Sequence, residues 1–157
     1  MRTLAQLRAT HAQPGRLTWI GVRPDRGAAM VSLRDVDLTE AGLTGDRYAG
    51  RDGKRAVTLI QAEHLPVIAD LSARDAFAPD LLRRNLVVSA INLLALKDLK
   101  VSIGTAVVEF TSPCHPCSKM ETALGPGGYN AMRGHGGWCA RVIETGHIQV
   151  GDQVCPA

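Results

Sequence analysis

Residues 113–137, PCHPCSKMETALGPGGYNAMRGHGG, join a cysteine pair to a glycine-rich run. They directly follow a β-branched and aromatic run at 106–111, which predicts a strand. Pro113 and Pro116, on either side of Cys114, remove backbone donors and restrict φ. The sequence therefore predicts a stiff turn at the end of a strand, and this turn carries Cys114 and Cys117.

A short helix is predicted after the turn, over SKMETALG at 118–125, with Ser118 as its cap and Gly125 at its end. Cys117 then lies near the helix N-terminus and close to Lys119, and both features favour a thiolate. We expect Cys117 to be a reactive or metal-ligating thiolate. The spacing alone leaves open that Cys114 and Cys117 are two small core residues at a strand end.

Composition places the chain among ordinary globular domains. Its 157 residues are 45% hydrophobic and 21% charged, and we expect a single domain over 1–157 with a core at about 17–154. A net charge of +3 and 4% aromatic residues argue against a nucleic-acid partner and favour a small anionic ligand. Neither a transmembrane run nor a signal peptide is apparent, so we expect a cytoplasmic protein without a membrane partner and with reduced cysteines.

About eight short strands are predicted from apolar runs bounded by turn residues. They cover 17–22, 28–33, 54–61, 86–91, 101–103, 106–111, 138–143 and 147–150, with a last strand starting at Val154. Hairpins are expected between 101–103 and 106–111, and between 138–143 and 147–150. Short loops imply antiparallel pairing, and closure removes exposed edges, so we expect a mainly β fold with short helices and a closed or nearly closed antiparallel barrel.

The remaining segments are predicted as helices or loops. Helices are expected near 63–71 and 79–84, whereas 38–53 is expected to be a loop with a functional role. Within that loop, Arg51 and Asp52 are expected to be solvated. His64 is expected to be an ordinary surface or cap residue.

Two further motifs bear on binding. Arg83, Arg84 and Asn85 lie where a helix meets a strand, so they either grip a phosphate or simply end a surface helix. The glycines at 125–128 and 134–137 fit neither a P-loop nor a dinucleotide fingerprint. They form either a lid over the cysteine turn or a pair of plain turns.

Zinc is a further alternative for the cysteine turn. Cys114, His115 and Cys117 offer soft ligands, and Cys139 or His135 could complete the set. However, the chain has no second pair at zinc-finger spacing. A thioredoxin-type dithiol is also weakly indicated, because the chain lacks a βαβ frame.

Taken in order, several segments resemble the MOSC family, named after the C-terminal domain of molybdenum-cofactor sulfurases. The resemblance covers about 17–154. The chain is most similar to the small stand-alone bacterial members. It rests on AGLTGDRYAG (41–50), KRAVTLIQAEHL (54–65), LLRRNLVVSAINLLAL (81–96), IGTAVVEFTSPCHPCSKM (103–120), ALGPGGYNAMRGHGG (123–137) and the closing hairpin with its Gly-Asp.

The resemblance implies a β-barrel-like fold, a cytosolic location and a pyranopterin molybdenum cofactor. It makes Cys117 the catalytic residue and metal ligand, as in the mitochondrial amidoxime-reducing component, which reduces N-hydroxylated compounds. The alternative is a persulfide on Cys117 that delivers sulfur for metal–sulfur cofactor assembly. Residues matching the family's cofactor cleft are Arg83, Asn85, Arg47, Arg23, Thr58 and Gln61.

The chain also departs from the family pattern at Tyr48, where many relatives have His, at Ala90, where many have Gly, and at Cys139. It has no fused aminotransferase-like desulfurase, so it is expected to work independently of pyridoxal phosphate. The expected partners are a small-molecule substrate and either an external electron donor or a cysteine desulfurase. The oligomeric state is left open, with a homodimer as one option.

Overall fold

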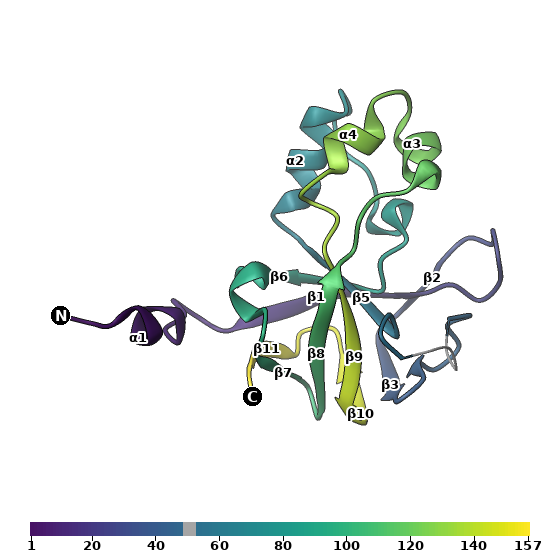
Figure 1. The fold of residues 1–157 in the computed structure, drawn as a ribbon. Coiled ribbons are helices and arrows are strands. Elements are labelled where there is room, and N and C mark those ends of the chain that lie inside the picture. The colour runs from purple at the N-terminus through teal and green to yellow at the C-terminus, as the bar shows by residue number, and fades with distance from the viewer. Residues whose placement is uncertain (49–52) are drawn as a thin grey trace.

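The computed structural model describes residues 1–48 and 53–157, and its architecture is a mainly β barrel capped by helices (Figure 1). An eight-stranded sheet has the order β11-β7-β8-β9-β5-β6-β1-β2. Its strands are β1 (Gly15–Val22), β2 (Val31–Leu33), β5 (Val57–Gln61), β6 (Leu86–Ser89), β7 (Lys100–Ile103), β8 (Ala106–Pro113), β9 (Trp138–Glu144) and β11 (Gln153–Pro156).

An additional pairing closes the sheet into a barrel. Strand β11 pairs with β1 as well as with β7, so seven strands form a ring and β2 continues outward as a hairpin from β1. The barrel predicted from the strand pattern is thereby confirmed. One pair, β5 and β6, is parallel, because the chain between them crosses over through helix α2 (His64–Leu71).

A second, three-stranded sheet has the order β10-β3-β4, with β3 (Asp35–Thr39), β4 (Gly42–Leu43) and β10 (Gly146–Gln149). The predicted hairpin between 138–143 and 147–150 is therefore wrong, because β10 pairs with β3. The prediction of a loop over 38–53 is also wrong at its start, where β3 and β4 pair. The expectation for Arg51 and Asp52 lies outside the described residues.

Helices α2, α3 (Ser118–Leu124) and α4 (Gly128–Met132) gather at one end of the barrel, whereas α1 (Leu4–Arg8) projects from the body (Figure 1). Two 3₁₀ helices, η1 (Pro79–Leu82) and η2 (Leu93–Leu96), complete the set. Helix α3 ends at Gly125 as predicted, but Cys117 takes the N-cap position expected for Ser118. None of the described helices is long and apolar enough to cross a membrane.

Two apolar cores explain why β5 and β6 have continuous apolar sequences. Leu59, Leu86 and Val88 point into the barrel, whereas Ile60 and Val87 pack outward against the helices. Both faces of these strands are therefore buried, which removes the usual alternation of apolar and polar residues. The apolar cluster outside the barrel fixes helices α2, α3 and α4 onto the barrel wall, and with them the cysteine turn that precedes α3.

Ala90 adopts a left-handed conformation with φ of +72°, which costs an L-residue about 1–2 kcal/mol. We expect Ala90→Gly to stabilise the protein by up to about 1 kcal/mol, because the greater freedom of unfolded glycine offsets part of the relieved strain. Urea unfolding measures this change. Ala123→Gly, inside α3, is the control and should cost about 1 kcal/mol. Equal destabilisation by both substitutions would contradict the strain at Ala90.

His147 on β10 has a raised pKa because its Nδ1 shares a hydrogen bond with Asp37 on β3, and Asp35 and Asp152 add negative charge. A pKa that is higher in the folded state than in the unfolded state stabilises the protein, and this stabilisation is complete at pH values below the unfolded-state pKa. This contribution disappears as the pH rises through the folded pKa. NMR titration of the imidazole should give a pKa above 6.5, and Asp37→Asn should lower it. Asp25→Asn, in the connection between β1 and β2, should leave the value unchanged.

Candidate functional site

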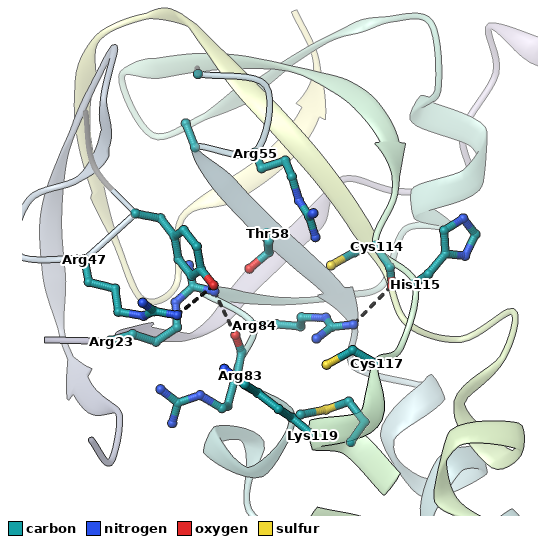
Figure 2. Close-up of a pocket in the computed structure, with 14 residues that line it drawn as sticks. Arg23, Arg47, Arg55, Thr58, Arg83, Arg84, Cys114, His115, Cys117 and Lys119 are labelled. Carbon is teal, nitrogen blue, oxygen red and sulfur yellow. Dashed lines mark hydrogen bonds between the residues drawn. The ribbon is translucent and has the colours of Figure 1, made fainter. Parts of the chain in front are cut away.

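A cavity of about 330 Å³ lies where the barrel end meets α3. Its lining includes five arginines and one lysine, and no carboxylate is among the described lining residues. Figure 2 shows these cations around the cavity with the sulfurs of Cys114 and Cys117 on one side. The cationic residues are Arg23, Arg47, Arg55, Arg83, Arg84 and Lys119. Such a lining attracts an anion.

Arg23 is held in place by Asp46, which is 4% exposed. The backbone N and Nε of Arg23 donate to Asp46 Oδ1 at 2.8 and 3.0 Å, and its Nη2 donates to Oδ2 at 2.8 Å. This bidentate ion pair fixes the end of β1 against the turn after β4. Asp46 therefore neutralises Arg23, and the remaining cations carry the excess charge of the cavity.

Asn85 lies beneath the cavity, fully buried, and organises its floor. Its Oδ1 accepts from Thr58 N, Thr58 Oγ1 and Arg23 Nη2, each at 3.1 Å, and its Nδ2 donates to Gly21 O at 3.0 Å. Arg23 and Thr58 line the cavity, so Asn85 positions two lining residues. It supports the site from below.

Gln61 lies at the far end of β5 and lines a second cavity. Its Nε2 donates to Ile91 O and Glu63 Oε1, both at 2.8 Å, and its Oε1 accepts from Leu93 N at 2.9 Å. The structure thus brings together Cys117, Arg23, Arg47, Thr58 and Arg83 in the first cavity and separates Gln61 from them.

Arg84 is 7% exposed and ties the cysteine turn to the glycine-rich loop. Its guanidinium donates to the carbonyls of Leu82, Gly136 and Cys114 at 2.9, 2.8 and 3.1 Å. Burial lowers the pKa of Arg84, whereas the neighbouring thiols of the three cysteines 114, 139 and 117 oppose this shift. Gly136 is required here because a Cβ on it would overlap Cys114 O.

Cys114 and Cys139 form a buried thiol pair beside the cavity. The hydrogen bond from Cys114 lowers the pKa of Cys139 to about 6, and the charge of Arg55 adds to this effect. The same hydrogen bond and burial raise the pKa of Cys114. The hydrogen bond therefore favours the proton on Cys114 and negative charge on Cys139, next to Arg55.

Cys117 differs from this pair because its side chain is exposed at the cavity wall. Its carbonyl accepts from Met120 N at 2.9 Å in the first turn of α3, while its thiol does not cap the helix. The extended backbone at Cys117, with φ of −131° and ψ of 179°, turns this side chain out of the helix. The sulfur is thereby presented to a molecule in the cavity.

Tyr48 forms another wall of the cavity together with two arginines. The guanidinium carbons of Arg23 and Arg47 lie 4.4 and 4.3 Å from its ring centroid. Arg47 Nη2 donates to the Tyr48 hydroxyl at 2.8 Å, while Arg47 Nε is buried without a partner. Tyr48 therefore orients cations, and its oxygen is already engaged by one of them.

The protein-family model for the MOSC domain matches residues 29–155. The chain belongs to the MOSC family. Similar solved structures include the YuaD protein from Bacillus subtilis, with 17% identity and a TM-score of 0.79 over 90% of this chain and 94% of that one. YiiM from Geobacillus stearothermophilus has 19% identity and a TM-score of 0.71, over 92% of this chain and 75% of that one.

YiiM from Escherichia coli has 20% identity and a TM-score of 0.71, over 90% of this chain and 69% of that one. At these identities the likeness supports the fold that this MOSC domain shares with them. Comparison with curated proteins gives no match.

Two arginines in this MOSC domain were missed as site residues by the sequence prediction. Arg55 precedes β5 and reaches the cavity beside Cys139, and Arg84 was considered only as part of the Arg83–Asn85 motif. A signal was present for both, since Arg55 precedes the strand that carries Thr58 and Arg84 is adjacent to Arg83. Among the described residues, no cluster of three His, Cys, Asp or Glu is placed to hold a metal ion.

Proposed function

We propose that this MOSC domain binds a pyranopterin molybdenum cofactor in the arginine-lined cavity, with Cys117 as the protein ligand of molybdenum. The observation that carries the proposal is an exposed thiol in the wall of a cavity whose described charged lining is entirely cationic. MOSC domains are associated with this cofactor. Its phosphate suits guanidinium donors, and a soft thiolate suits molybdenum.

The hydrogen bonds of the cavity indicate which cations are left to hold a phosphate. Arg23 is neutralised by Asp46, and Arg84 donates to three carbonyls. Arg47 keeps an unpartnered buried Nε, and Arg83 Nη1 uses one donor on Ala28 O at 2.8 Å. We therefore assign the phosphate contact to Arg47 and Arg83, with Arg55 on the thiol side of the cavity.

The reaction we propose is reduction of an N-hydroxylated base. The N–O bond breaks, two electrons and two protons enter, and an amine and water leave. When bound, the cofactor supplies a metal that exchanges two electrons, and an external electron carrier replenishes them. In this chain, Cys117 anchors the group and the arginines orient it. Lys119 lines the cavity on α3, next to the cysteine turn, and we propose it as a proton donor to the substrate.

Elemental analysis tests the proposal on protein made in a host that synthesises the cofactor. We expect molybdenum and phosphorus in about equal amounts, because each pyranopterin carries one phosphate, together with reduction of an N-hydroxylated base. Arg47→Met with Arg83→Met should lower both contents. Arg74→Met, on the outer surface, is the matched control and should retain them. Metal-free protein from a host whose other molybdenum enzymes are loaded would overturn the proposal.

The exposure of Cys117 favours one second candidate, a persulfide carrier, because a partner enzyme can reach the thiol. The Cys117 thiolate would attack the outer sulfur of a desulfurase persulfide, forming Cys117–S–SH and releasing the desulfurase thiolate. Mass spectrometry after incubation with a cysteine desulfurase and cysteine should then find one added sulfur on Cys117. An adduct on another cysteine, or no adduct, would exclude this function.

A further inference from the structure

A second cavity of about 600 Å³ borders the segment 114–116. Cys114 and His115 line both cavities, so the cysteine turn separates them. Figure 2 shows the ring of His115 directed away from Cys117 and the arginines. The other walls come from the end of β5, the start of α2, η2 and the loop before β9.

The polar groups of this second cavity are mainly hydrogen-bond donors. Lys97, His64 and His115 line it, and no carboxylate is among the described lining residues. Side-chain oxygens that face this region are already used, since Asn92 Oδ1 accepts from Leu94 N at 3.2 Å and Gln61 Oε1 accepts from Leu93 N. What remains is an excess of donors, which suits an anionic group.

Three of the backbone carbonyls at the cavity are engaged as well. Those of Gly136 and Cys114 accept from Arg84, and that of Gly137 accepts from Cys114 N at 2.8 Å. A ligand that must donate hydrogen bonds therefore competes at these three carbonyls with donors of the protein. A ligand that only accepts them is favoured.

The rest of the lining is apolar and partly aromatic. Leu93, Leu94, Pro113, Pro116 and Trp138 contribute, and Leu94 is 61% exposed. Trp138 stacks on Phe110 with ring centroids 5.5 Å apart, which holds its indole in a fixed position. A flat apolar body beside a negatively charged head fits this combination of walls and donors.

A pair of imidazoles lies beside the cavity, and one of them, His64, lines it. His64 and His135 lie edge to face with ring centroids 5.0 Å apart, and His135 Nδ1 is buried without a partner. Burial, with the charge of His135, lowers the pKa of His64, and the neighbouring carboxylate of Glu63 opposes this shift. An anion near these rings would relieve the cost of protonating His64 and would supply an acceptor.

We propose that this second cavity, bounded by Lys97, His64, His115 and Trp138, binds a small aromatic carboxylate. The carboxylate head meets Lys97 and the imidazoles, and the ring lies against the apolar wall. The site is independent of the cofactor proposed for the first cavity, although it shares the cysteine turn with it.

Benzoate is the probe, titrated into the full chain by NMR and calorimetry. We expect saturable one-site binding with a dissociation constant on the order of millimolar, as befits so small a ligand. The indole signal of Trp138 should move, and that of Trp19, on β1, should stay. Neutral benzamide should bind at least about tenfold more weakly, because it lacks the charge that Lys97 recognises.

Lys97→Met should weaken benzoate binding by about tenfold, and its exposed position means that the fold should be kept. Lys100→Met, at an exposed position on β7, is the matched control and should bind as the wild type does. Arg55→Met tests the first cavity and should also leave binding unchanged. Binding that survives Lys97→Met, that is lost in Arg55→Met, or that never saturates would overturn the proposal.

Discussion

Cys117→Ser is expected to abolish molybdenum retention and to lower N-hydroxylamine reduction by at least about 100-fold, equivalent to about 2.7 kcal/mol of transition-state stabilisation. A serine hydroxyl stays protonated at neutral pH and is a hard ligand, whereas molybdenum takes a soft thiolate. Elemental analysis and turnover of an N-hydroxylated base measure the two effects on protein made in a cofactor-synthesising host.

The same substitution should leave the protein at least as stable as the wild type. Cys117 occupies the N-cap of α3 with extended backbone, and serine is a preferred residue there. We therefore expect the free energy of unfolding, measured with urea, to be unchanged or raised by up to about 1 kcal/mol. Loss of function together with retained stability cannot be attributed to unfolding.

Cys155→Ser, on the terminal strand β11, is the matched control and should keep both metal and activity. Full activity in Cys117→Ser would remove Cys117 from the metal site. Molybdenum-free wild type that carries a persulfide on Cys117 would instead support the sulfur carrier.

Much of the fold could be predicted because local patterns and long-range packing agree. The apolar runs of β5, β6 and β8 mark barrel strands, and the Pro-rich turn places Cys114 and Cys117 at a barrel end. The partner of β10 could not be predicted in this way. A single residue, Thr145, connects β9 to β10, which suggests a tight hairpin, yet it forms a corner that directs β10 to β3 in the other sheet.

The candidate site could be predicted only in part, for a similar reason. Asn85 and Gln61 both lie in apolar segments and both make several hydrogen bonds, but one lies beneath the cationic cavity and the other faces the second cavity. Sequence position cannot separate these outcomes, since the sheet register decides which face each residue takes. Arg55 and Arg84 enter the site through convergence of β5, β6 and the cysteine turn.

Arg84→Met is expected to destabilise the protein by about 3 kcal/mol. Three carbonyls that accept from the guanidinium would lose their donor inside the protein, at roughly 1–3 kcal/mol for each one left unsatisfied. Removing a buried charge returns part of this loss, because its desolvation cost disappears, and methionine refills part of the volume. Urea unfolding at neutral pH measures the difference.

Arg74→Met is the matched control, because Arg74 also donates to two carbonyls, those of Leu124 and Ala123, but at an exposed position. Water replaces the lost donor there, so we expect a change below about 1 kcal/mol. Equal effects of the two substitutions would mean that the Arg84 contacts are no more valuable than surface ones. A larger effect at Arg84, with lower cofactor retention than Arg74→Met, would mean that the guanidinium binding Cys114 O and Gly136 O holds the cysteine turn in place for Cys117.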